Sequence, residues 1–180
     1  MRTLGRGPRN LLLAFHILFA ATWLGGVAAL ILVSVLHPRP SSSEALVVVR
    51  TTMQWIDWTL IIPSCLGSLL TGFLSSQLTP WGYFKHHWVV VKWVLTVGMV
   101  LFGALALGPW VDATATHASE RGIAALDEPA YAGLAGRVVA FAIVQLVLLL
   151  VMLGLSAFKP SRILGGAAPR SPRPERDRPG

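Results

Sequence analysis

The chain has 180 residues, of which 54% are hydrophobic and only 13% are charged. Soluble domains carry about 25% charged residues, so this chain lacks the polar side chains needed to cover a soluble surface. A water-soluble globular enzyme is therefore excluded. The net charge of +7 does not indicate nucleic-acid binding, because Lys and Arg cluster at the chain ends. The single cysteine, Cys65, excludes an intramolecular disulfide and a Cys-rich metal site.

Four apolar runs are each long enough to cross a bilayer, which takes about 20 helical residues. These runs cover residues 11–36, 55–78, 88–110 and 134–158. The first run exceeds the apolar core of a cleavable signal peptide, about 7 to 15 residues, so we interpret it as a retained span. The sequence predicts an all-α fold, a four-helix transmembrane bundle.

Positive charges set the expected orientation, because Lys and Arg that flank a span are retained in the cytoplasm. Most of them lie before the first span, between the second and third spans, and after the fourth. We therefore expect both termini in the cytoplasm and a multi-pass protein of the cell membrane, such as a bacterial inner membrane. Residues 1–159 form the predicted membrane domain. Residues 160–180, rich in Pro, Gly, Arg and Ser, form a predicted disordered basic tail.

Two features mark the connections on the opposite side. Ser41 and Glu44 have capping-box spacing, which predicts that the second helix begins well before Trp55. Residues 111–133 are expected to form a loop, and the acidic residues just before Pro129 are typical of the start of the next helix.

Small residues recur at every fourth position in the first two spans, a spacing that lets membrane helices pack closely. They are Ala21, Gly25 and Ala29 in the first span and Ser64, Ser68, Gly72 and Ser76 in the second. We expect these stripes to contact each other or a neighbouring helix. Pro63 lacks a backbone N–H and is expected to bend the second span.

Polar side chains in the second span share one helical face. They are Asp57, Ser64, Ser68, Thr71 and Ser75. Because hydroxyls and carboxylates avoid lipid, this face is expected to line the bundle interior or a wet cavity, and it is a candidate polar pathway. Asp57 is expected near the outer surface, at a depth where it can pair with Arg137. A plain interfacial ion pair and solvent exposure remain the structural alternatives to transport.

His16 and Lys92 are expected at a comparable depth in the cytoplasmic half, in the first and third spans. Lys92 is close enough to the surface to extend its amine to water. The functional alternative is a clamp for a ligand, since imidazole suits haem iron or copper. A second haem ligand would then come from Lys92, His86, His87 or Met99. For copper, Cys65 and Met99 are soft ligands, although such residues more often pack in a core.

The segment from His16 through Trp23 to Gly26 resembles the first helix of copper-resistance-D-type membrane domains. Thr71-Gly72, residues 79–82 (Thr-Pro-Trp-Gly) and Lys92 resemble later motifs of that family. The same skeleton also resembles the J-type protoporphyrinogen oxidase. It consists of His16 followed by Trp23 in the first span, Pro63 in the second, and Lys92 after a tryptophan in the third. A fuller pattern includes residues 61–64 (Ile-Ile-Pro-Ser), 67–72 (Gly-Ser-Leu-Leu-Thr-Gly) and 80–93. Over residues 10–115 this pattern is most similar to an uncharacterised family of small integral membrane proteins.

The oxidase resemblance implies a role for His16 and Lys92 in handling haem or a porphyrin. The leading hypothesis is a non-catalytic or redox-accessory membrane protein that holds haem b between the first and third spans. His16 would ligate the iron, Lys92 would be a second ligand or a counter-charge for a propionate, and Trp23 and Trp88 would form aromatic walls. His16 and Met99 are the candidate metal ligands. If the protein is an enzyme, it is expected to be a membrane oxidoreductase.

Two other functions stay open at the level of sequence. One is transport of, or resistance to, copper or another small cation, along the face that contains Asp57. The other is a structural or assembly subunit of a membrane complex. The expected partners are membrane lipid and either a second copy of the chain or another membrane protein, and not nucleic acid. No phosphate loop or paired-carboxylate site supports a hydrolase or a phosphoryl-transfer enzyme.

Overall fold

The computed structural model describes residues 5–78 and 87–158, and within these ranges every regular element is helical. Four helical segments are long and apolar enough to cross a membrane: Arg6–Leu36, Ser43–Leu78, Val89–Asp127 and Pro129–Ser156. The prediction of an all-α chain with four membrane-spanning helices is confirmed at this level. The predicted tail, His86 and residues 79–82 lie outside the described residues.

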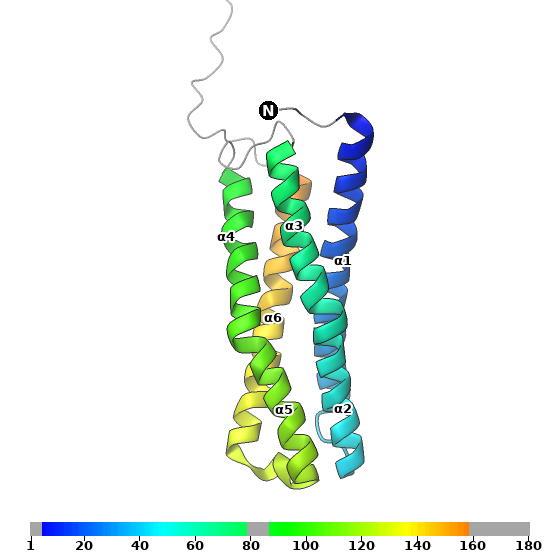
Figure 1. The fold of residues 1–180 in the computed structure, drawn as a ribbon. Helices are drawn as coiled ribbons and strands as arrows, with labels where there is room; N and C mark the ends of the chain where they lie inside the picture. The colour runs from blue at the N-terminus through cyan, green and yellow to red at the C-terminus, as the bar shows by residue number, and fades with distance from the viewer. Residues whose placement is uncertain (1–4, 79–86, 159–180) are drawn as a thin grey trace, which may run out of the picture.

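Two short π-helical turns and one 3₁₀ helix divide these segments into labelled elements (Figure 1). In chain order the elements are α1 (Arg6–Leu36), α2 (Ser43–Ile56), η1 (π, Asp57–Ile61), α3 (Ile62–Leu78), α4 (His87–Phe102), η2 (π, Gly103–Leu107), α5 (Gly108–Arg121), η3 (3₁₀, Gly122–Asp127) and α6 (Pro129–Phe158). The second span is therefore α2–η1–α3, and the third is α4–η2–α5.

The four spans form an up-and-down bundle in which α1 and α4 run in the same direction (Figure 1). Both α1 and α4 pack against α3 and α6, so α1 and α4 occupy diagonally opposite corners. We call the end that holds the start of α1 the N-terminal end. The opposite end, which holds the α1–α2 connection and η3, is the distal end.

At the distal end the second and third spans extend beyond the thickness of a bilayer. Ser43–Leu78 contains 36 residues, about 54 Å of helix against a hydrocarbon core of about 30 Å. Trp55 and Trp58 are 64% and 57% exposed at the α2–η1 junction, and exposed tryptophans are typical of the level where membrane meets water. The part of α2 before Trp55 therefore belongs to a distal head outside the hydrocarbon.

The loop predicted over residues 111–133 is wrong, because α5 continues to Arg121 and η3 follows it. Val111, Ala115 and Ala118 are buried along one face of α5, which packs against α2. This small apolar stripe stabilises a helix in which most of the residues after Val111 are polar. The predicted start of α6 at Pro129 is confirmed.

The second helix begins at Ser43, well before Trp55 as predicted, but its capping residue is not Ser41. The Ser42 hydroxyl accepts a hydrogen bond from the Ala45 N–H at 3.2 Å. This side chain satisfies one of the free N–H groups at the start of a helix.

Glycines set the close contact between the first two spans, but the stripe predicted in the first span does not make this contact. A Cβ at Gly25 would meet nothing within 4 Å, whereas one at Gly26 would lie 3.0 Å from the Ile61 side chain. A Cβ at Gly67 would lie 2.6 Å from the ring of Phe19. The face of α1 that contacts the second span therefore includes Gly26 and lies one position away from the predicted stripe.

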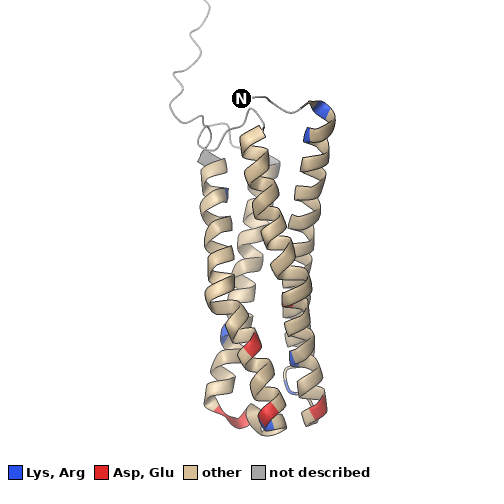
Figure 2. Ribbon diagram, viewed as in Figure 1, with Lys and Arg blue, Asp and Glu red and all other residues tan. Residues whose placement is uncertain are grey.

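Charge is distributed unevenly along the bundle, as Figure 2 shows. In the described ranges, all acidic residues lie towards the distal end, namely Glu44, Asp57, Asp112, Glu120, Asp127 and Glu128. Among them, Asp57 is the only buried one.

Candidate functional site on the inner face of the second span

Polar side chains are buried along one face of the second span, from α2 through η1 to α3. Of the five residues predicted from helical spacing, four are buried, namely Asp57, Ser64, Ser68 and Thr71, whereas Ser75 is partly buried. Arg50 lies two turns before Asp57 and is buried as well. We call the five buried residues the polar face. Whether it acts as a pathway stays a prediction.

Asp57 is the first residue of η1 and is only 3% exposed. Its Oδ2 atom has no hydrogen-bond partner among the described residues. A Cβ at Gly108 would lie 3.7 Å from this oxygen, so the carboxyl faces the point where η2 ends and α5 begins. Isolated π turns are rare and occur frequently at functional sites. Here two of them meet at one buried carboxyl.

Asp112 lies one helical turn after Gly108, and its carboxyl is hydrogen-bonded to neighbouring side chains, unlike Oδ2 of Asp57 within the described residues. Its Oδ1 accepts hydrogen bonds from Gln54 Nε2 at 2.9 Å and from Trp58 Nε1 at 3.2 Å. These two bonds join α2–η1 to α5. Of the two neighbouring carboxyl groups, therefore, Asp112 is a structural link and Asp57 has an oxygen available for another group.

Two hydroxyls of the polar face, those of Ser64 and Thr71, donate to the backbone of their own helix. Ser64 Oγ donates to the carbonyl of Leu60 or Ile61, and Thr71 Oγ1 donates to the Gly67 carbonyl at 2.7 Å. Ser64 follows Pro63, which has no N–H to continue the helical ladder, and η1 ends at Ile61, two residues before this proline. The hydroxyl oxygens keep lone pairs that can accept hydrogen bonds from a ligand or water.

His16 on α1 lies next to the last residue of the polar face, on the side of the N-terminal end of the bundle. His16 Nδ1 lies 2.9 Å from Thr71 Oγ1. Because the Thr71 proton is used in the bond to Gly67, we assign Nδ1–H as the donor, which leaves Nε2 as an acceptor. A Cβ at Gly72 would lie 3.5 Å from His16 Cε1, so glycine gives the imidazole room to lie against α3.

Lys92 on α4 is held by a different helix from His16. Its Nζ donates to Ser156 Oγ on α6 at 2.7 Å. The next residue, Trp93, donates from Nε1 to Ser76 Oγ on α3 at 3.3 Å. The two residues of the proposed haem clamp are thus each anchored by a serine or threonine, His16 by α3 and Lys92 by α6.

Most of the remaining residues predicted for the haem and copper sites pack in the apolar core of the bundle. Trp23 and Met99 are buried in one apolar core, and Cys65 belongs to it too. Cys65 Sγ donates to the Ile62 carbonyl at 3.1 Å. Trp88 lies in the first turn of α4, and its side chain is outside the described part of the chain. Within residues 5–78 and 87–158, no group of three His, Cys, Asp or Glu side chains is arranged to hold a metal ion.

The predicted pairing of Asp57 with Arg137 is wrong. Arg137 is exposed, and its guanidinium carbon lies 5.8 Å from the centre of the Trp110 ring. In the described ranges, the one ion pair joins Arg121 to Glu128 at 3.3 Å. A long cationic side chain at the start of α6 gains more by extending over an interfacial ring than by entering the bundle.

Three buried polar residues were missed by the sequence reasoning: Arg50, Thr114 and Gln145. Arg50 donates from Nε to the Tyr131 hydroxyl at 2.7 Å, and its spacing of two turns from Asp57 is the signal that places it on the same face. Gln145 is buried in the middle of α6. Its signal is that it is the one polar side chain in the apolar run between Arg137 and Ser156.

Comparisons with protein-family models, with curated proteins and with solved structures found no match to this chain. The family resemblances stay predictions, and the function has to be argued from the side chains themselves.

Proposed function

We propose that the protein is a multi-pass membrane transport protein that moves protons along the polar face, between Asp57 and His16. The observation that carries this proposal is the buried Asp57 carboxyl, whose Oδ2 has no hydrogen-bond partner in the described part of the chain. A buried polar group without a partner costs free energy. Carboxyl groups within membrane spans typically mark ion pathways or proton relays.

The polar face offers acceptors between the two titratable ends. Along the helix, Ser64, Ser68 and Thr71 follow Asp57 in steps of about 10, 6 and 5 Å. These steps exceed one hydrogen bond, so water molecules complete the relay. At the N-terminal side, Nε2 of His16 accepts the proton, since the bond to Thr71 holds Nδ1. With both termini in the cytoplasm, as the distribution of Lys and Arg supports, Asp57 faces the outer side.

Protons suit this face better than copper does. The side chains available between Asp57 and Thr71 are a carboxyl and hydroxyls, whereas copper(I) prefers soft sulfur ligands. The thiol of Cys65 donates to the Ile62 carbonyl of its own helix. The thioether of Met99 lies on α4, which contributes nothing to the polar face.

The test is proton flux into proteoliposomes that contain the purified full-length protein and a trapped pH-sensitive dye, driven by a potassium diffusion potential. We expect flux above that of empty liposomes, and a loss of at least 10-fold in Asp57→Asn. Asp112→Asn is the matched control, because the same change is made one turn beyond Gly108, and it should keep most of the flux.

Native flux equal to that of empty liposomes contradicts the proposal, as does unchanged flux in Asp57→Asn. Flux of Na⁺ or Cu⁺ that depends on Asp57, without proton flux, contradicts the choice of the proton and favours small-cation transport.

Haem b binding is the second candidate function, favoured by the geometry of His16. Histidines that ligate metals usually donate their other ring N–H to an oxygen, and His16 donates from Nδ1 to Thr71. His16 would hold the iron through Nε2, and bound haem would supply one-electron chemistry there. The fit of a second ligand is weaker, because the Lys92 amine is bonded to Ser156 on another helix.

A further inference from the structure

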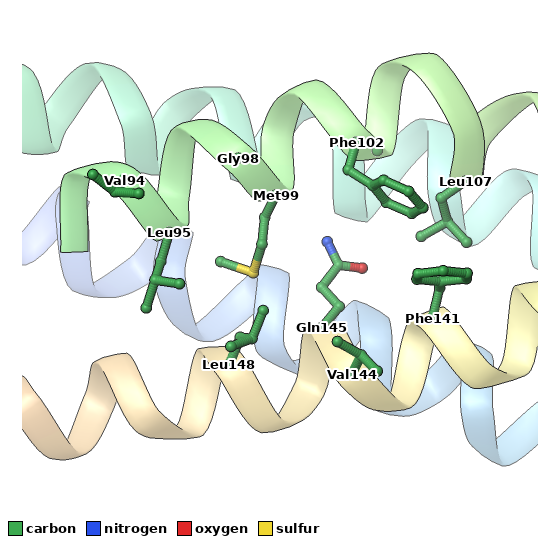
Figure 3. A pocket seen from close by; sticks show the side chains of 11 residues that line it. Val94, Leu95, Gly98, Met99, Phe102, Leu107, Phe141, Val144, Gln145 and Leu148 are labelled. Atoms are coloured by element: carbon green, nitrogen blue, oxygen red, sulfur yellow. The ribbon is translucent and has the colours of Figure 1, made fainter. Parts of the chain in front are cut away.

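A cavity of about 220 Å³ lies between α4–η2 and α6, within the membrane-spanning part of the bundle (Figure 3). Its walls include Val94, Gly98, Met99 and Phe102 on one side and Phe141, Val144 and Gln145 on the other. Gln145 is the one side chain in this lining with hydrogen-bonding N and O atoms. The cavity therefore combines an apolar wall with a single amide.

The Gln145 amide extends from α6 into the space between the two helices (Figure 3). The residue is 7% exposed, and its Oε1 has no hydrogen-bond partner among the described residues. In hydrocarbon, a polar group in this state costs free energy, and no bulk water is available to satisfy it. A ligand that supplies a hydrogen-bonding atom would remove this cost.

The lining restricts the class of ligand in three ways. It contains no charged side chain, so the ligand is uncharged. The ring centroids of Phe102 and Phe141 lie 4.6 Å apart, and Trp110 packs against both rings, so an aromatic ring finds matching surfaces there. The volume is below the range of about 300–1,000 Å³ typical of small-molecule pockets, so it holds one ring rather than a macrocycle.

The route of entry is from the lipid. Val94 and Val144, on opposite walls of the cavity, are 67% and 50% exposed. Both lie inside apolar spans, where the surrounding medium is the hydrocarbon core. A molecule that dissolves in the bilayer can therefore reach the amide without crossing water.

We propose that this cavity binds an uncharged, membrane-dissolved, planar six-membered carbon ring that carries oxygen, of the quinone or hydroquinone class, through the amide of Gln145. A hydroquinone hydroxyl donates to Oε1, and a quinone carbonyl accepts from the amide NH₂ of the same side chain. The ring lies against Met99 and the pair of phenylalanines. This site is built from α4, η2 and α6 and shares no residue with the polar face on α2, η1 and α3.

The test is calorimetric titration of the full-length protein in detergent micelles, with empty micelles subtracted. The probes are duroquinone, its hydroquinone, and durene, the hydrocarbon that has the same carbon skeleton and methyl groups without oxygen. We expect the two oxygen-bearing probes to bind more tightly than durene. Gln145→Leu should weaken the oxygen-bearing probes about 5- to 10-fold, the equivalent of one hydrogen bond, and should leave durene binding unchanged.

Because durene binds without the amide, its binding to Gln145→Leu also shows that this variant is folded and keeps the cavity. Gly98→Leu should abolish binding of all three probes, because a Cβ at Gly98 meets nothing within 4 Å and the longer side chain fills the cavity. Gly25→Leu is the matched control on α1, where a Cβ also meets nothing, and it should bind like the native protein. Equal affinity for durene and duroquinone, unchanged quinone affinity in Gln145→Leu, or no binding above empty micelles would each overturn the proposal.

Discussion

The bundle contains one tightly packed helix pair and one loosely packed pair. Between α1 and α3, an added Cβ at Gly67 would collide with the Phe19 ring. On α4, added Cβ atoms at Gly98 and Gly103 would meet nothing within 4 Å, and a cavity separates α4 from α6. In the most apolar stretch of the third span, 11% of the residues are buried, against 22–28% in the other three spans.

The difference shows how a membrane bundle can keep two kinds of site. Lipid provides no hydrophobic drive between helices, so close approach depends on small residues. Glycines at the α1–α3 contact hold the polar face and His16 in fixed positions. Large side chains on α4, such as Met99 and Phe102, hold this helix away from α6 and leave space for a guest molecule.

Gly67→Ala should have the largest effect on stability. The new Cβ would lie 2.6–2.7 Å from three ring carbons of Phe19, and overpacking of this kind costs about 1–3 kcal/mol. Gly98→Ala is the same change in the loose pair, where it should be neutral or stabilise by up to about 1 kcal/mol. Unfolding followed by circular dichroism in a titration with denaturing detergent measures both. Equal losses in the two variants would show that the pairs do not differ in packing.

At the junction of the two pairs, Asp57 and Asp112 should respond in opposite ways to one substitution. Asp112→Asn weakens two charge-assisted hydrogen bonds and should lower the free energy of unfolding by about 1 kcal/mol. Asp57→Asn removes a buried carboxyl with an unpaired oxygen and should leave stability unchanged or raise it. The same unfolding titration compares them. A clear loss in Asp57→Asn would mean that the carboxyl has a structural partner.

The smallest expected effects are the coupling energies of two hydrogen bonds within the spans. A double-mutant cycle with His16→Leu and Thr71→Val should give about 0.6 kcal/mol, the average for such bonds between membrane helices. The cycle with Lys92→Met and Ser156→Ala should give less, because the flexible lysine stem can direct its amine to another acceptor. A larger coupling energy for Lys92 and Ser156 than for His16 and Thr71 would show that the α4–α6 hydrogen bond is the more rigid of the two.

The sequence predicts the membrane spans well because apolar runs of bilayer length have no other stable surroundings. It fails for α5, where the apolar stripe of Val111, Ala115 and Ala118 is too small to be separated from the polar residues around it. The packing stripe of α1 is shifted by one residue for a similar reason. Gly25 and Gly26 are adjacent, and only the position of α3 decides which one makes the contact.

For the site, helical spacing predicts a shared inward face for Ser64, Ser68 and Thr71, since these residues lie in one α-helix with a period of 3.6 residues. Asp57 is buried as predicted, although the π turn η1 separates it from α3. The partners of His16 and Lys92 depend on which helices are neighbours, and no local pattern contains that information. Gln145 is visible in the sequence as a single amide in an apolar run. The cavity that it faces exists only because α4 stands away from α6.

The length of the second span has an electrical consequence. Asp57 lies 21 residues from Leu78, about 32 Å along the helix and close to the thickness of the hydrocarbon. The carboxyl is thus at the edge of the region across which a transmembrane voltage falls. Travel from Asp57 to the level of Thr71 spans about two-thirds of that region, so each charge exchanges about 1.5 kcal/mol with a potential of 100 mV. Loading at Asp57 would be nearly insensitive to voltage, and transfer towards His16 would be the step that voltage drives.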